Sequence, residues 1–100
     1  MMLPRSVHNR VCYALMHTAA LRRGSLQADA RWLECIESTL AAASPERREF
    51  FELFFVQGLE PDEVLFRLYI ERSTLYSWRD YFLWNVALRA AEAGLIHVRE

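Results

Sequence analysis

The sequence contains no lysine: all twelve of its basic residues are arginine. This absence excludes lysine nucleophiles, Schiff-base lysines and the lysine of phosphate-binding loops. An excess of positive charge is also lacking, because the twelve arginines face thirteen acidic residues and leave a formal net charge of −1. The composition therefore excludes a polybasic protein that attracts nucleic acid or anionic lipid through its overall charge.

Long apolar runs and cysteines are scarce as well. No apolar stretch approaches the roughly 20 residues that cross a bilayer, and Met1 to Arg5 lack the charged head and apolar run of a secretory signal. The two cysteines, Cys12 and Cys35, are expected to be small buried thiols in a reducing compartment. We expect a cytoplasmic protein with no membrane contact.

The few prolines and glycines divide the chain into helical segments. Prolines stand where helices could begin and glycines where helices could end: Pro4, Pro45 and Pro61, then Gly24, Gly58 and Gly94. Between them the apolar spacing is helical, and no β-branched run bounded by turn residues is present. With 100 residues, 53% of them hydrophobic, the chain is predicted to form a single all-α domain, residues 1–100, of about five helices.

Two helices are predicted in residues 1–43, as an N-terminal helical pair that serves packing or dimerisation. The first runs from about Ser6 to Arg23, and the second is capped by Ser25 and fades through residues 41–43. The inner face of the first is predicted to be Val7, Val11, Ala14, Leu15, Thr18 and Ala19. The inner face of the second is predicted to be Leu26, Ala30, Leu33, Ile36 and Leu40.

Three more helices are predicted in residues 44–100. Ser44 caps a helix from Pro45 to about Gln57 whose apolar residues cover most of its circumference, as is typical of a central core helix. A short helix begins at Pro61, and a break at residues 69–70 precedes a long helix from about Arg72 to Gly94.

The last two of these helices have the spacing of a helix-turn-helix with a long recognition helix. Its inner positions are predicted to be Val64, Leu65 and Leu68, Ile70 in the turn, then Leu75, Trp78 and Phe82. The outer positions that remain are Arg72, Ser73, Thr74, Tyr76, Ser77, Arg79 and Asp80. Arginine can present two donors to guanine or phosphate, and hydroxyls bind phosphate oxygens or base edges. We therefore expect residues 72–79, except the inward-facing Leu75 and Trp78, to contact double-stranded DNA. Arg47 or Arg48 is expected to touch phosphate.

Three segments carry a family resemblance: residues 49–59 (EFFELFFVQGL), 61–64 (PDEV) and 72–79 (RSTLYSWR). Together they resemble region four of bacterial sigma factors and, more closely, small phage and prophage transcription regulators of the ArpU/RinA type. The resemblance covers roughly residues 45–95. It implies sequence-directed binding of double-stranded DNA and control of phage gene transcription. Between residues 67 and 80, however, the excess of positive charge is small: three arginines and two acids give a balance of +1.

A second apolar stripe on the long helix leaves the oligomeric state undecided. It consists of Tyr81, Trp84, Leu88, Ala91 and Leu95. This stripe packs either on the N-terminal helices or on a second copy of the chain, in a homodimer. Two other functions remain as alternatives: a protein-interaction module that docks on RNA polymerase or another regulator, and a small phage DNA-packaging subunit of the kind that forms rings.

No catalytic or metal site is predicted. His8 and Cys12 lie four residues apart and Cys35 could approach them, but a zinc site needs a fourth ligand and no paired Cys-x-x-Cys or His-x-x-x-His is present. His17 and His97 have no neighbour in the sequence that suggests catalysis. We expect a protein that is not an enzyme and uses no metal or cofactor.

Overall fold

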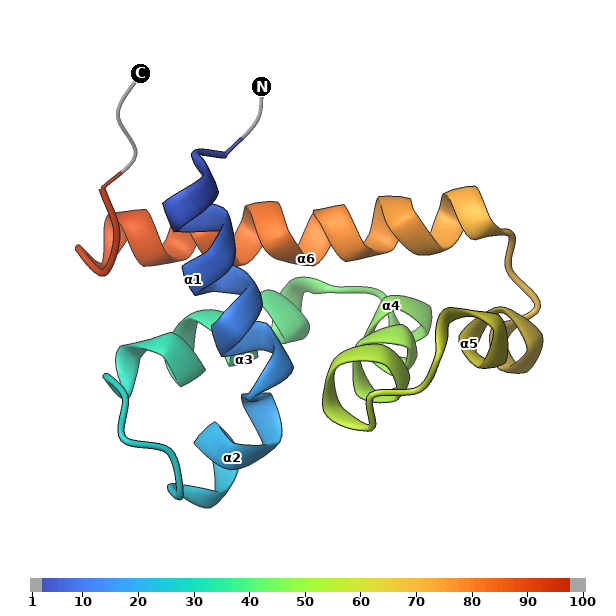
Figure 1. Cartoon of the computed structure of the whole chain (residues 1–100), viewed down its shortest axis with the longest axis horizontal. Coiled ribbons are helices and arrows are strands. Elements are labelled where there is room, and N and C mark those ends of the chain that lie inside the picture. The colour runs from blue at the N-terminus through green and yellow to red at the C-terminus, as the bar shows by residue number, and fades with distance from the viewer. Residues whose placement is uncertain (1–2, 98–100) are drawn as a thin grey trace.

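A computed structural model describes residues 3–97, and within this range all regular secondary structure is helical (Figure 1). The elements are α1 (Arg5–Met16), α2 (Thr18–Arg23), α3 (Arg31–Ala42), α4 (Pro45–Phe51), the π-helical segment η1 (Glu52–Val56), α5 (Pro61–Leu68) and α6 (Arg72–Glu92). The predicted all-α fold is confirmed, with one helix more than expected because the first predicted helix is divided.

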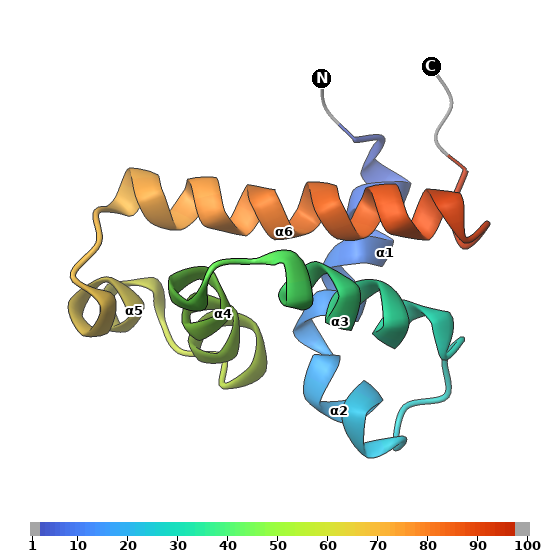
Figure 2. The ribbon, with the colours of Figure 1, turned by 180° about the vertical axis from the view of Figure 1, so that it is seen from behind.

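Helix α6 is the element beside which α1, α3, α4 and α5 lie. Figures 1 and 2 show α5 and α4 beside its first half and α1 and α3 beside its second half. Its buried residues follow one face of the helix through both halves. Leu75 and Phe82 face inward in the first half, and Val86 and Ala90 do so in the second. One helix thus closes two parts of a continuous core.

The core between α4 and α6 is aromatic. Phe50 and Phe51 are fully buried, and their rings lie 6.2 and 5.0 Å from that of Phe82 on α6. Phe50 also meets Trp78 edge-to-face at 5.7 Å. Such pairs contribute about 0.5–1.5 kcal/mol beyond the area that they bury. The prediction that this helix forms the centre of the core is confirmed.

The end of this central helix is a π-helix, which the spacing of its residues did not predict. The Gln57 amide donates to the carbonyl of Glu52, five residues earlier, at 2.8 Å. A π turn is wider than an α turn. Here it accompanies three mutually packed rings, with Phe54 and Phe55 centred 5.2 and 6.2 Å from Phe50.

The predicted helix from Ser6 to Arg23 is wrong in one respect, because it breaks at His17 into α1 and α2. Two side chains compete there for helix carbonyls. The His17 ring lies 2.7 Å from the carbonyl of Tyr13, and the Thr18 hydroxyl donates to that of Leu15 at 2.7 Å. Such local bonds offer the backbone an alternative to continuous helix. The predicted inner face is buried except for Ala19, which is half-buried.

The second helix was also predicted to begin too early, since α3 begins at Arg31. The Ser25 hydroxyl donates back to the carbonyl of Ala20 at 3.3 Å and so closes α2 instead of capping a new helix. Just before α3, where Ala30 is the N-cap residue, the Asp29 carboxylate accepts from the Arg31 amide at 2.9 Å. The inner face differs as a result: Trp32, Cys35, Ile36, Thr39 and Leu40 are buried, whereas Leu26 and Leu33 are half-buried and Ala30 is exposed.

The other helix boundaries follow the prediction. The Ser44 hydroxyl accepts from the Arg47 amide at 3.3 Å, as expected of a cap. Helix α6 ends at Glu92, and the Leu95 amide then donates to the carbonyl of Ala90 at 2.8 Å. This turn brings Ile96 back into the core, where 1% of it is exposed.

Candidate nucleic-acid interface

The candidate interface is formed by α5, the turn at residues 69–71 and the first turns of α6. Val64 and Leu75 are fully buried where the two helices meet. The other predicted inner residues also contact the core, partly buried: Leu65, Leu68, Ile70 and Trp78. The residues predicted to face inward are therefore buried or partly buried, while the helix-turn-helix and DNA binding by its outer side stay predictions.

The turn has an unusual backbone at Tyr69. This residue has a left-handed conformation, with φ 54° and ψ 45°, which ends α5. The Ile70 amide then donates to the carbonyl of Leu65 at 3.3 Å. A left-handed conformation is costly for a side chain with a Cβ atom, so the sharp turn is obtained here without the glycine that usually serves this purpose.

The predicted DNA-contacting residues of α6 are not equally accessible. Arg72, Ser73, Tyr76 and Ser77 are exposed, together with the neighbouring Asp80. Thr74 and Arg79 are half-buried, since they lie at the edges of the outer face. At about 3.6 residues per turn, the exposed positions form one stripe along the first two turns of the helix.

The arginines of this surface are paired with acids. Arg72 donates from Nη2 to Oδ1 of Asp62, across the turn, at 2.6 Å. Hydrogen bonding to Tyr76 and then to Asp62 raises the pKa of the Arg72 guanidinium above its ordinary value. Arg79 pairs with Asp80 at 3.1 Å, and its guanidinium carbon lies 4.9 Å from the centre of the Tyr76 ring. Residues 61–80 contain four acids and three arginines, so this surface has no net positive charge.

The two predicted phosphate contacts from α4 differ in their surroundings. The guanidinium carbon of Arg47 lies 4.6 Å from the centre of the Tyr81 ring on α6, and the side chain is half-buried. Arg48 is exposed and forms no ion pair within residues 3–97. Tyr81 is nine positions from Arg72, about 13 Å along the helix. Arg47 is thus separated from the first turn of α6.

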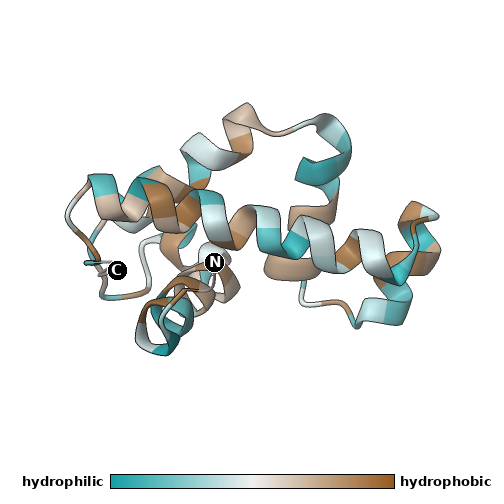
Figure 3. Ribbon diagram, turned by 90° about the horizontal axis from the view of Figure 1, so that it is seen from above, coloured by the Kyte–Doolittle hydropathy of each residue, from teal (hydrophilic) through white to brown (hydrophobic). Residues whose placement is uncertain are grey.

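Two exposed aromatic side chains beside this surface were not singled out from the sequence. Phe66 on α5 is 69% exposed and Tyr69 in the turn is 92% exposed. The predicted inner positions of α5 already left residue 66 on the outside, and that pattern was the available signal. Seen from above in Figure 3, hydrophobic and hydrophilic residues alternate along α6 and at the end of the molecule formed by α5.

The predicted interface stripe does not form one exposed surface. Leu88 is 55% exposed, Tyr81 and Trp84 are half-buried, and Leu95 is buried within the chain. Four other residues of α6 fill the space toward α1 and α3: Leu83, Val86, Ala87 and Ala90. Intramolecular packing therefore involves part of the stripe, and a homodimer stays a prediction.

The histidine and cysteines considered for metal binding form no cluster of three ligands in the part of the chain that the structure describes. The Cys12 sulfur lies 3.7 Å from Nδ1 of His8. Burial raises the pKa of the Cys12 thiol, an effect that nearby Arg79 partly offsets. Burial also raises the pKa of the Cys35 thiol. Both sulfurs therefore remain protonated thiols at neutral pH.

No helix within residues 3–97 is long and apolar enough to cross a membrane.

Comparison of the chain with protein-family models, with curated proteins and with solved structures finds no match. The function is therefore inferred from the chain's own residues.

Proposed function

We propose that this chain binds double-stranded DNA through the outer face of α6 and regulates transcription, as a phage or prophage regulator would. The observation that carries the proposal is the division of α6 between two faces. Leu75 and Phe82 anchor its first half in the core, while Ser73, Tyr76 and Ser77 project outward with Arg72. The major groove of B-DNA, about 12 Å wide, admits such a helix end with its hydroxyl and guanidinium donors.

Phosphate must compete with acids for the arginines of this surface. The Arg72–Asp62 pair is exposed, with 53% and 84% of the two side chains accessible. An exposed ion pair contributes about 0–1 kcal/mol, so a phosphate oxygen can replace Asp62 at little cost. The affinity of one copy is expected to be modest, and a homodimer would double the phosphate contacts.

The proposal is tested by measuring DNA affinity against salt. Fluorescence anisotropy would measure the affinity for a labelled duplex from upstream of the chain's own gene and for a random duplex. The salt concentration would be raised from about 50 to about 200 mM, a range over which phosphate contacts weaken. The variants Arg72→Gln and Arg79→Ala are expected to weaken binding about threefold to tenfold. Arg23→Gln, which removes an exposed arginine at the end of α2, is the control.

Binding that does not depend on salt, equal affinity for both duplexes, or the same loss from Arg23→Gln would contradict the proposal. Sedimentation of the same samples would test the assembly. Particles of ring size would favour a DNA-packaging subunit over a regulator.

The exposed aromatic residues favour a second candidate, a module that docks on RNA polymerase or another regulator. Phe66 and Tyr69 are the most exposed large hydrophobic side chains of the described residues. Aromatic residues are enriched at protein interfaces. Under this alternative, Phe66→Ser and Tyr69→Ser would weaken binding to purified RNA polymerase, whereas Arg79→Ala would leave that complex largely intact. The reverse pattern would support DNA binding alone.

A further inference from the structure

A pocket of about 650 Å³ lies between α1, α3 and the segment that follows α6. This is the opposite end of α6 from the turn at residues 69–71 (Figure 1). Its apolar lining comes from five parts of the chain: Ala14, Leu21, Leu26, Trp32 and Leu95. Pockets of about 300–1,000 Å³ with mainly apolar walls and a few polar groups are typical of small-molecule sites. The size and lining thus suit a small organic molecule.

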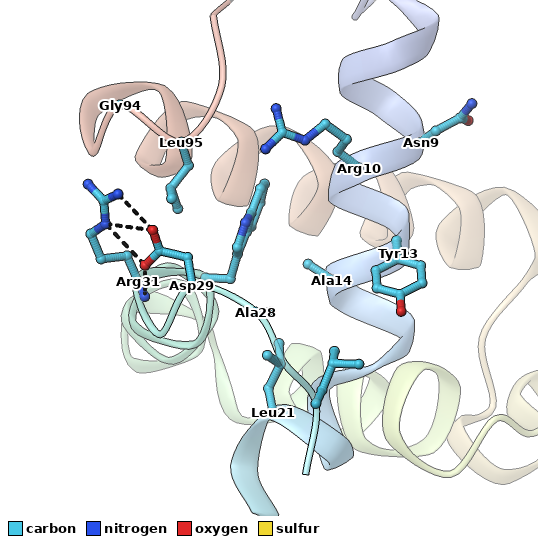
Figure 4. Close-up of a pocket in the computed structure, with 12 residues that line it drawn as sticks. Asn9, Arg10, Tyr13, Ala14, Leu21, Ala28, Asp29, Arg31, Gly94 and Leu95 are labelled. Atoms are coloured by element: carbon cyan, nitrogen blue, oxygen red, sulfur yellow. Dashed lines mark hydrogen bonds and ion pairs between the residues drawn. The ribbon is translucent and has the colours of Figure 1, made fainter. Parts of the chain in front are cut away.

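One cation at the pocket, Arg10, has no acidic partner among the residues that the structure describes. Figure 4 shows Arg10 reaching from α1 into the upper part of the pocket, with Leu21 on the far side. The guanidinium carbon of Arg10 lies 5.9 Å from the centre of the Trp32 ring. Within residues 3–97 Arg10 forms no ion pair. Its charge is therefore available to a ligand.

Among residues 3–97, the only acid that lines the pocket is Asp29, which is already neutralised. Arg31 approaches both carboxylate oxygens of Asp29, with Nη2 2.7 Å from Oδ2 and Nε 3.1 Å from Oδ1. The same guanidinium donates from Nη1 to the carbonyl of Ala93 at 2.7 Å, which fixes it to the end of α6. Asp29 and Arg31 together carry no net charge, so the polar part of the lining is positive because of Arg10.

We propose that this pocket binds a small organic acid, an apolar body of roughly 10–20 non-hydrogen atoms that carries one anionic group. The anion pairs with the Arg10 guanidinium, and the body lies against Trp32 and Leu21. A cation is disfavoured, because it would meet Arg10 without an available counter-charge. This ligand site is independent of the DNA-binding proposal.

The test uses 1-naphthylacetate as the probe and the neutral alcohol 1-naphthaleneethanol, which has the same ring system, as its matched comparison. Each is titrated into ¹⁵N-labelled protein, and the indole N–H signals of the three tryptophans are followed. Trp78 and Trp84 do not line the pocket and serve as internal references. We expect a saturable shift of the Trp32 signal and an affinity for the acid about fivefold greater than for the alcohol.

Two variants separate the charge from the cavity. Arg10→Gln is expected to remove the preference for the acid, whereas Arg5→Gln, an exposed arginine of the same helix outside the pocket, should preserve it. Ala28→Trp places a large ring at the exposed rim and should block both probes. Equal affinities for acid and alcohol in the unmodified protein, saturation without a shift at Trp32, binding unaffected by Ala28→Trp, or no binding would each overturn the proposal.

Discussion

At the scale of single residues, Tyr69 concentrates backbone strain in one exposed position. Its φ of 54° is unfavourable for any residue with a Cβ atom, and its side chain is 92% exposed. Tyr69→Gly is therefore expected to stabilise the protein by about 0.5 kcal/mol, because relief of strain slightly exceeds the greater entropy of glycine in the unfolded chain. Urea unfolding measures the change. Tyr69→Ala removes the same ring but keeps the Cβ atom, so a gain of equal size in that variant would show that strain is not the cause.

Under the DNA-binding proposal, the carboxylate of Asp62 competes with phosphate for Arg72. Asp62→Asn removes the competing charge while keeping a side chain of the same shape. If α6 binds DNA, this variant should bind about threefold more tightly, because the exposed ion pair no longer has to be exchanged. Anisotropy with the upstream duplex measures the affinity. Glu46→Gln removes an exposed acid from α4 and controls for net charge; the same gain in that variant would point to a general effect of charge.

The two thiols give the protein a pH dependence on the alkaline side. Burial raises the pKa of both Cys12 and Cys35 above the ordinary value of 9.0. In the unfolded chain the thiols lose their protons first, so their contribution to stability is complete below about pH 9 and declines as pH rises through the folded-state pKa. Urea unfolding at about pH 7.5 and at about pH 10, which lie on either side of the ordinary thiol pKa, should show this decline. The double variant Cys12→Ala, Cys35→Ala should show a smaller decline, and an unchanged slope would contradict the assignment to the thiols.

At the scale of helices, Arg22 connects three elements. From α2 its guanidinium reaches Glu37 on α3 at 2.9 Å and Glu52 in η1 at 3.1 Å. These side chains are one third to one half exposed, so Arg22→Gln is expected to cost about 0.5–1 kcal/mol in the free energy of unfolding. Arg23→Gln is the matched control, since that neighbour forms no ion pair within residues 3–97. Equal losses in the two variants would contradict this connecting role.

The helices that the sequence predicted well are those with strong local signals. Ser44 and Pro45 mark the start of α4, Pro61 marks that of α5, and the apolar spacing locates α6. The errors come from side chains that compete for the same backbone groups. Ser25 suits a cap but bonds backward to α2, while the Asp29 carboxylate accepts from the Arg31 amide at the start of α3. Helix propensity cannot decide which of two nearby polar residues begins a helix, because tertiary packing determines the outcome.

The candidate site was predictable only in part, for a related reason. The spacing of Leu75, Trp78 and Phe82 located the outer face of α6, because it depends on the helix period alone. The spacing could not show that Asp62 neutralises Arg72, since this contact crosses a turn. Nor could it show the π turn of η1, where the Phe55 ring packs against Phe82 on α6 at 6.1 Å.

At the scale of the whole molecule, the segment after α6 closes the core. Ile96 is 1% exposed, and the Arg31 guanidinium holds the carbonyl of Ala93 at 2.7 Å. Ile96→Ala is expected to lower the free energy of unfolding by about 2–4 kcal/mol, through lost burial and the cavity that remains. Leu88→Ala, which truncates a side chain 55% exposed on α6, should cost less than about 1 kcal/mol. Chemical denaturation of both variants measures this difference, and similar losses would show that the segment is not part of the core.

The length of α6 has a mechanical consequence. Its 21 residues form a rod of about 30 Å whose one end lies in the pocket region and whose other end carries Ser73 and Ser77. An α-helix is about 10 Å in diameter with its side chains, so a rotation about its axis moves the tips of the outer side chains most. A turn of about 20° would sweep an outer side chain through about 2 Å, from the same helix radius. That displacement exceeds half the length of a hydrogen bond, so the contacts that Ser73 and Ser77 can make depend on Leu75 and Phe82, whose burial keeps the helix from turning.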